Sequence, residues 1–247
     1  MQNLVVNGCS FTQETGYTKS WAGFLNDKIN PENYINLAQG GAGNKYICDS
    51  TISFLESNTI SPKNTLIIIM WSGIGRKDLH ISEEWFFYFK EYYDYLCRRN
   101  GETAYLHSGG LTNSWLENKE TRKIFENIYK ISDPLSICIE NLLFFIHLKS
   151  YLKSNNYKFY FTNYFNTWNP AVESTNAGDY CIGHFCTKHT LNPIYQNFDF
   201  DDWIFLNDAK DCLGDLAEKT YSLDSTGHPI EETHSRFANA LYSKLFT

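Results

Sequence analysis

The feature that most constrains the fold is a continuous apolar run from Thr65 to Trp71, TLIIIMW. Strands buried on both faces of a parallel sheet have such uninterrupted runs. Two shorter runs, Leu4–Val6 and Tyr34–Ala38, precede it, and a glycine-containing loop follows each of the three. Because helical patterns separate these strands, we expect βαβ crossovers and an α/β fold with a mostly parallel sheet.

The chain has no linker rich in glycine, proline or serine, so we expect one domain over residues 1–247, with insertions at about 75–135 and 163–220. A fourth strand is expected at Tyr157–Thr162, and Trp203–Leu206 is a short strand or edge element. Helices are expected from Trp21, near Ile47–Asn58, and at Glu83–Arg99, Ser114–Tyr129, Pro134–Ser154 and after Pro229. The remaining segments are expected to be loops at Gly101–Asn113 and Asn163–Asp202 and a turn-like or weakly helical stretch at Asp208–Thr220.

The charge balance restricts the partners. With 28 acidic and 21 basic residues the net charge is -7, which argues against nucleic acid or an anionic membrane as the main partner. No run of about 18 apolar residues occurs in the chain, so we expect no membrane span. We expect Leu142–Ile146 to be the buried face of a helix.

The seven cysteines are odd in number and scattered, which favours free thiols. Because the first strand begins at once, we expect an intracellular protein or part of a larger particle, such as a phage product.

Ser10 follows the first strand, where ligands bind in open α/β sheets. A serine hydroxyl needs a base to become a nucleophile. An acid and a histidine, Asp224 and His228, stand near the other end of the chain, just before the last helix. We therefore expect the two ends of the chain to meet, with Ser10 beside His228.

Four short blocks, in this order, resemble the SGNH (GDSL) hydrolase superfamily of esterases and lipases. They are Gly8-Cys9-Ser10-Phe11-Thr12, Asn36-Leu37-Ala38-Gln39-Gly40-Gly41, Trp71-Ser72-Gly73-Ile74-Gly75-Arg76 and Asp224-Ser225-Thr226-Gly227-His228-Pro229. The resemblance implies an SGNH/flavodoxin-like three-layer α/β/α sandwich. It also implies a triad of Ser10, His228 and Asp224, with the amides of Ser10 and Gly41 donating to the oxyanion.

The chain departs from the family pattern at three places. Cys9 stands where the family has aspartate, and one extra residue separates Asp224 from His228. The family's third block carries an asparagine that completes the oxyanion hole, and the loop after Trp71 has none. Ser72, Arg76, a backbone amide or Asn44 is the expected replacement. Arg76 is otherwise an ion-pairing residue or a contact to substrate.

Other motifs have plainer interpretations. Cys181, His184, Cys186 and His189 are suitable zinc ligands in type, but their spacing fits no common finger, so we expect no metal. The Gly40–Gly43 loop lacks the Gly-x-Gly-x-x-Gly spacing of dinucleotide sites, so we expect no cofactor. His234 is expected to be a surface or packing residue. The aromatic residues of Trp85–Tyr95 are expected to pack in the core and a lid, with sugar stacking as the lesser alternative.

These observations predict a serine esterase that cleaves a carboxylic ester, with an O-acetyl group on a glycan as the narrower expectation. Its partner is then a small-molecule or glycan ester. Two alternatives stay open. One is a binding or structural protein that keeps the fold without the oxyanion hole, and the other is a zinc-dependent hydrolase.

Overall fold

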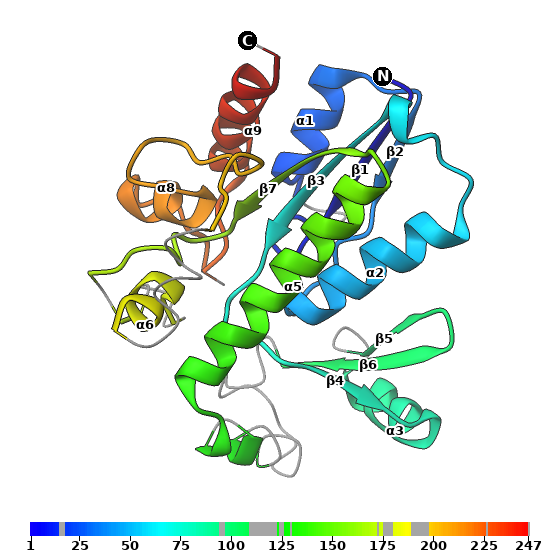
Figure 1. Ribbon diagram of the computed structural model, residues 1–247, viewed down its shortest axis with the longest axis vertical. Helices are drawn as coiled ribbons and strands as arrows, with labels where there is room; N and C mark the ends of the chain where they lie inside the picture. Colours follow the sequence, from blue (N-terminus) through cyan, green and yellow to red (C-terminus); the bar gives the residue numbers. More distant parts are fainter. Residues whose placement is uncertain are drawn as a thin grey trace.

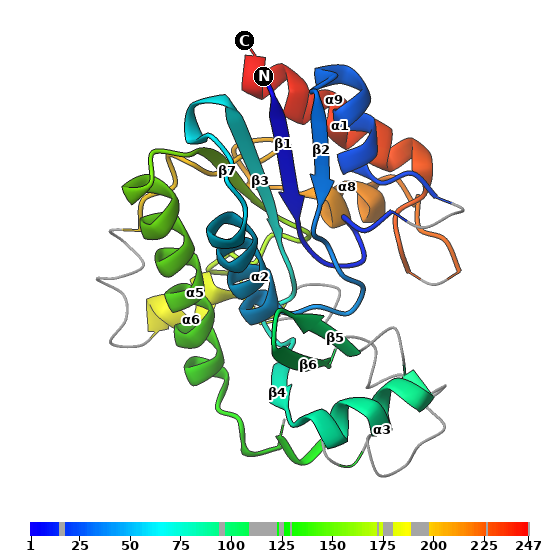
Figure 2. The ribbon, with the colours of Figure 1, turned by 90° about the vertical axis from the view of Figure 1, so that its right-hand side faces the viewer.

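A computed structural model gives the architecture. It describes residues 1–247 except 15–17, 94–96, 109–122, 124, 125, 129, 172, 175–179, 189–197, 226 and 247. The main sheet has four strands in the order β2-β1-β3-β7, all parallel. Their bounds are β1 (Asn3–Asn7), β2 (Asn33–Asn36), β3 (Thr65–Trp71) and β7 (Lys158–Asn163). Because the strands run the same way, all four end at one edge of the sheet, the lower edge in Figure 2.

Helices cover both faces of this sheet (Figures 1 and 2). On one face α1 (Trp21–Ile29) packs against α9 (Glu231–Phe246), and α8 (Leu213–Lys219) lies beside α9. On the other face α2 (Asn44–Ser57) packs against α5 (Pro134–Ser154), with α6 (Ile182–Lys188) next to α5. The fold is therefore the expected three-layer α/β/α sandwich with a parallel central sheet.

The alternation of side chains along β3 explains why its run of apolar residues is unbroken. All seven residues of the strand are buried. Ile67, Ile69 and Trp71 join the cluster under α2 and α5, whereas Leu66, Ile68 and Met70 join the cluster under α1 and α9. Burial of each such side chain contributes roughly 1.5–3 kcal/mol. Because Leu66–Trp71 supply both cores, these six positions are all apolar, whereas Thr65 at the start of the strand satisfies its hydroxyl by hydrogen bonds with Asn3 and Ser61.

Helix α5 agrees with the predicted bounds. Asp133 caps it through a hydrogen bond from the Ser136 amide to the Asp133 carboxylate (2.9 Å), and proline occupies the first helical position. By length and composition alone α5 is apolar enough to cross a membrane. One of its faces is buried in the core, including Leu142 and Phe145, so within the described residues it serves as a core helix.

A second, smaller sheet was not expected. It has the order β4-β6-β5 and is antiparallel, with strands β4 (Asp78–Ile81), β5 (Cys97–Asn100) and β6 (Thr103–His107). Together with α3 (Glu83–Tyr93) it lies beyond the carboxyl edge of the main sheet (Figure 2). The helix predicted to reach Arg99 therefore ends at Tyr93, and the loop predicted from Gly101 contains β6. Both predictions missed the Asn100-Gly101 dipeptide, a strong hairpin signal.

Other boundaries also differ from expectation. The predicted loop Asn163–Asp202 contains the short helix α6, and β2 already ends at Asn36. Helix α8 agrees with the weakly helical alternative for Asp208–Thr220. The predicted helix Ser114–Tyr129 lies mostly outside the described residues. The edge element was correct, because Trp203 forms a parallel bridge with Phe161 of β7.

A buried carboxylate joins the small sheet to the main domain. Asp78 of β4 accepts hydrogen bonds from the backbone amides of Gly43 (2.8 Å) and Tyr46 (2.7 Å), in the first turn of α2. His107 of β6 contacts the same carboxylate through Nδ1 at 2.7 Å, and both side chains are fully buried. Asp78 therefore caps a helix whose own N-cap, Gly43, has no side chain to do so.

Replacing Asp78 by asparagine tests this cap. Asp78→Asn replaces one carboxylate oxygen by an NH2 group, which then faces the N–H donors without an acceptor. We expect the free energy of unfolding to fall by about 3 kcal/mol. For a chain of this length that corresponds to a fall in Tm of roughly 6–12 °C. The matched control is Asp27→Asn, which removes a half-exposed ion pair with Lys19 and costs at most about 1 kcal/mol. Equal Tm values for the two variants would contradict the capping role.

Candidate active site

The central contact of the site joins the two ends of the chain. His228 Nε2 lies 2.8 Å from Ser10 Oγ, between residues 218 positions apart in the sequence. Both residues are partly buried, so an approaching molecule can reach the pair. A hydroxyl and an imidazole nitrogen at this distance share a hydrogen bond, which is the arrangement in which a histidine can take a proton from a serine.

The loop that carries Ser10 is shaped by close contacts just after β1. A Cβ atom on Gly8 would lie 2.3 Å from Thr12 Oγ1 and 2.9 Å from the carbonyl oxygen of Met70, so the position admits only glycine. The Thr12 and Gln13 amides both donate to the carbonyl of Cys9 (2.9 and 3.0 Å). These contacts fold the chain into a tight turn that holds Ser10 at the edge of the sheet.

The loop after β2 is fastened to this turn. Asn36 Nδ2 donates to the carbonyl of Thr12 (3.0 Å), and the Gln39 amide donates to the carbonyl of Gly8 (3.1 Å). Gly41 follows with φ +77°, a conformation that favours glycine. Within the described residues, neither the Gly41 nor the Ser10 backbone N–H donates to another group. Two backbone donors thus stay available beside the Ser10 hydroxyl.

Asp224 shapes the loop that carries His228. Its carboxylate accepts a hydrogen bond from the backbone amide of His228 (3.0 Å), and its own amide donates to the carbonyl of His228 (2.8 Å). A bridge between Leu223 and Pro229 continues this short hairpin. The structure therefore brings Asp224 and His228 together, with the carboxylate on the backbone of the histidine.

An aromatic ring supports the imidazole from the side of the serine loop. Phe11, which is 5% exposed, lies with its ring centroid 5.3 Å from that of His228. The other side of Phe11 contacts Tyr164, the residue after β7, at 5.3 Å in an edge-to-face arrangement. Packing of this kind restricts the ring of His228 and keeps Nε2 directed at Ser10.

A second histidine, His234, connects the His228 loop to helix α1. His234 in the first turns of α9 is 4% exposed, so it is a buried packing residue rather than a surface one. Its Nδ1 accepts a hydrogen bond from the amide of Trp21 at the start of α1 (3.2 Å). The ring also hydrogen-bonds the backbone carbonyl of Pro229, next to His228. His234 thereby ties the base-bearing loop to the helix that follows the serine loop.

Burial lowers the pKa of His234 to about 4, and the nearby His228 acts in the same direction, whereas the bond to Pro229 opposes it. The ring is therefore neutral at physiological pH. In that state Nδ1 accepts from Trp21 and Nε2 keeps the proton.

Two residues considered for the oxyanion hole serve the fold instead. Asn44 Nδ2 donates to the carbonyl of Ser72 (3.2 Å) and to Asn141 Oδ1 (2.6 Å), while Asn44 Oδ1 accepts from the Ser72 amide (2.7 Å). Both amide hydrogens of Asn44 and the backbone N–H of Ser72 are thus used. The Ser72 hydroxyl is buried and has no hydrogen-bond partner among the described residues. We therefore assign neither residue as an oxyanion donor.

The remaining candidates are placed as follows. Arg76 lies in the loop after β3, with its guanidinium carbon 5.6 Å from the ring centroid of Tyr164. Cys181 and Cys186 are buried and are not part of a disulfide, and His189 lies outside the described residues. Among the described residues, no group of three or more histidine, cysteine or acidic side chains is arranged to hold a metal ion.

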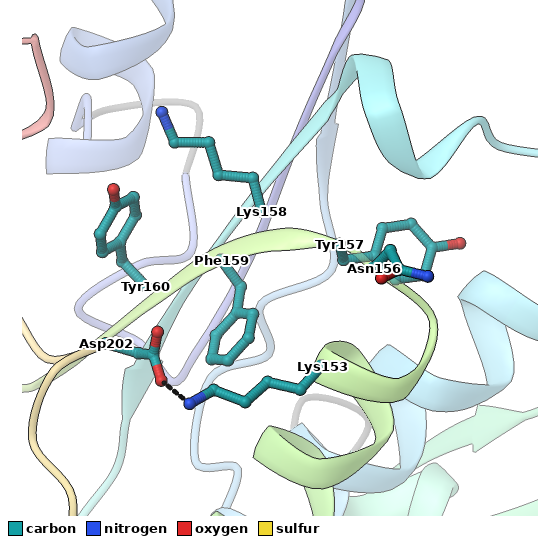
Figure 3. A pocket seen from close by; sticks show the side chains of 7 residues that line it. All are labelled: Lys153, Asn156, Tyr157, Lys158, Phe159, Tyr160 and Asp202. Carbon is teal, nitrogen blue, oxygen red and sulfur yellow. Dashed lines mark ion pairs between the residues drawn. The ribbon is translucent and has the colours of Figure 1, made fainter.

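A surface hollow of about 350 Å³ lies elsewhere (Figure 3). Its walls are the end of α5 and the start of β7, with Lys153, Phe159 and Asp202 among the lining residues. In a parallel sheet the start of β7 is at the edge opposite Ser10. The hollow is therefore not part of the candidate site.

Sequence patterns did not reveal several supporting residues. Phe11 and Tyr164 lie in the loops that follow β1 and β7, a position that could have identified them. Asp78, His107 and Asn141 gave no local signal, because their partners are distant in the chain.

Comparisons with known proteins give little beyond the fold. No family model matches the sequence, and no curated protein matches it. Among solved structures, the lipase Lip_vut3 from a goat rumen metagenome is similar with a TM-score of 0.49 and 11% identity, covering 98% of this chain and 97% of that one. A member of the lipolytic protein G-D-S-L family from Veillonella parvula has the same TM-score and 10% identity, with coverage of 98% and 97%. Similarity at this level carries no argument about the family or the activity of this chain.

The pKa of His234 predicts how acid affects stability. Because the folded pKa of about 4 lies below the ordinary value of 6.5, the unfolded chain binds more protons between these pH values. Stability therefore falls as the pH drops from 6.5 to 4, by up to about 3 kcal/mol from this residue. His234→Gln should lose that part of the pH dependence, measured by denaturant unfolding at pH 7 and pH 4. The exposed-site control His147→Gln should keep the wild-type difference; an unchanged pH dependence in His234→Gln would refute this account.

Proposed function

We propose that this protein is a serine ester hydrolase in which Ser10 is the nucleophile and His228 is the general base. The observation that carries the proposal is the 2.8 Å contact between His228 Nε2 and Ser10 Oγ. Two further features support it. The pair lies at the carboxyl edge of a parallel sheet, and two backbone amides beside it have no partner among the described residues.

In the first half of the reaction, His228 Nε2 takes the proton of the Ser10 hydroxyl as Oγ attacks the carbonyl carbon of the ester. The oxyanion that develops accepts hydrogen bonds from the amides of Ser10 and Gly41. When the bond to the alkoxy oxygen breaks, the imidazolium returns its proton to that oxygen. The alcohol leaves, and the acyl group stays on Ser10.

In the second half, water attacks the acyl group with His228 again as base, and the acid leaves as Ser10 recovers its proton. Asp224 has two proposed roles, to stabilise the imidazolium and to hold the loop that carries His228. Its hydrogen bond from the His228 backbone amide supports the role in the loop. Because Asn44 is engaged by Ser72 and Asn141 and the Ser72 hydroxyl is buried, we assign the oxyanion hole two backbone donors. One donor fewer raises the barrier by roughly 3–4 kcal/mol, so we expect modest turnover.

The narrower proposal is an O-acetyl ester on a glycan. Trp85 and Tyr88 of α3 are 50% and 38% exposed, so the aromatic segment is only partly packed, with Phe86 and Phe89 buried. Trp85 and Tyr88 contact each other at 5.5 Å in the small sheet unit beyond the carboxyl edge. Exposed aromatic rings at this position supply a surface on which a sugar could stack.

The loop after β3 also supports a second candidate, a binding protein that keeps the fold without catalysis. It has no asparagine, and its only serine faces the interior. The same experiment separates the two candidates, since only an activated serine reacts with a fluorophosphonate.

We expect a fluorophosphonate probe to label Ser10 and the protein to hydrolyse 4-nitrophenyl acetate. Ser10→Ala should abolish labelling, and Ser10→Ala and His228→Gln should each lower turnover by at least about 10³-fold. The control Ser243→Ala, on the exposed side of α9, should react like the wild type. If wild-type protein that is folded by circular dichroism is not labelled, the esterase proposal is refuted and the binding protein is favoured.

Asp224 can be tested separately from its loop contact. Asp224→Asn retains an oxygen for the His228 amide but removes the negative charge, whereas Asp224→Ala removes both. If the carboxylate stabilises the imidazolium, kcat of the asparagine variant falls by at least about 10²-fold. Wild-type kcat for Asp224→Asn together with a large loss for Asp224→Ala would leave the residue with a role in the loop only.

A further inference from the structure

Arg76 is held in a fixed loop at the edge of the candidate site. Its backbone amide closes a turn onto the carbonyl of Gly73 (3.1 Å), and Asn141 Nδ2 donates to the carbonyl of Ile74 within the same turn (3.0 Å). Two residues later, Asp78 binds the amide of Gly43. The segment therefore runs along the loop that carries Gly41.

No described residue neutralises the guanidinium of Arg76. Its Nη1 is buried and has no hydrogen-bond partner among the described residues, and no described carboxylate pairs with it. The nearby Asp78 carboxylate is already engaged by Gly43, Tyr46 and His107. An unpaired buried donor on a charged group is costly. In a chain with 28 acidic residues, the lack of a described carboxylate partner for Arg76 needs an explanation.

Ring contacts connect this arginine to the reaction centre. The guanidinium lies over Tyr164, Tyr164 packs edge-to-face on Phe11, and Phe11 contacts the His228 ring. Tyr164 is 3% exposed and therefore rigidly held. The loops that carry Arg76 and Ser10 follow the neighbouring parallel strands β3 and β1, so both residues belong to the carboxyl edge of the sheet.

We propose that Arg76 binds an anionic group, a carboxylate or a phosphate, on the ester substrate. This inference rests on the proposed function and names its substrate class. A planar guanidinium suits the two oxygens of such an anion. Stacking on Tyr164 fixes the plane of the donors. Arg76 is partly exposed, and no described group accepts a hydrogen bond from its Nη1, so the side chain retains donor capacity for an anion.

Two matched pairs of esters test the proposal, one for each side of the scissile bond. On the acyl side, mono-4-nitrophenyl succinate is compared with 4-nitrophenyl methyl succinate. On the leaving-group side, 4-acetoxybenzoate is compared with its methyl ester. We expect the wild type to favour the anionic member of at least one pair by tenfold or more in kcat/KM, mainly through KM. Arg76→Gln should reduce that ratio at least tenfold, and Arg76→Lys should retain part of it.

Arg99→Gln is the matched control. Arg99 also lies over an aromatic ring, that of Phe86 at 4.6 Å, but its guanidinium is paired with Glu83 (2.7 Å). This variant should keep the wild-type ratio. A general loss of positive charge would change both arginine variants alike.

Binding to the inactive Ser10→Ala protein supplies a readout that does not depend on turnover. By calorimetry, the preferred anionic ester should bind at least tenfold more tightly than its neutral partner, and adding Arg76→Gln should remove the difference. If Ser10-dependent hydrolysis occurs with equal ratios in wild type and Arg76→Gln, the esterase stands and the role of Arg76 is refuted. If no ester is cleaved, the calorimetric comparison alone decides for or against Arg76.

Discussion

A hydrogen bond between the hydroxyl of Ser10 and the ring of His228 requires both ends of the chain to be held at one edge of a sheet. The parallel arrangement does most of this, because it brings the carboxyl ends of all four strands together. Buried polar groups do the rest. Asn36 and Gln39 join the second loop to the first, and His234 joins the last loop to α1. Each of these contacts crosses between elements, so the reaction centre depends on the whole fold.

The main sheet could be predicted from the sequence because its signal is local. The run Leu66–Trp71 is apolar at every position, and the structure gives β3 the predicted bounds Thr65–Trp71. The proline and the capping aspartate of α5 worked in the same way. Prediction failed where strands were short and mixed in composition. Cys97–Asn100 has two arginines, and its strand identity depends on pairing with β6, which no local pattern shows.

The candidate site was predictable where a residue type carries its own chemistry. Ser10 and His228 were identified from their positions next to a strand end and a terminal helix, and the structure brings them together. The role of an asparagine side chain is harder to predict, because it depends on which groups the folded chain places beside its amide. Asn44 looked like a possible oxyanion donor, yet Ser72 and Asn141 take both of its hydrogens. Such pairings become visible only when the distances are known.

The cap that Asp78 provides for α2 has a consequence for how this protein can change. A short insertion with its own sheet looks like a part that could be exchanged or deleted without harm. Here the insertion supplies the carboxylate that satisfies two amides at the start of a core helix, next to the glycine loop of the candidate site. Removing it would leave those amides without an acceptor and free the loop beside them. A change in the small sheet therefore also affects the main domain. Replacing the small sheet by another insertion would require a new acid at the position of Asp78.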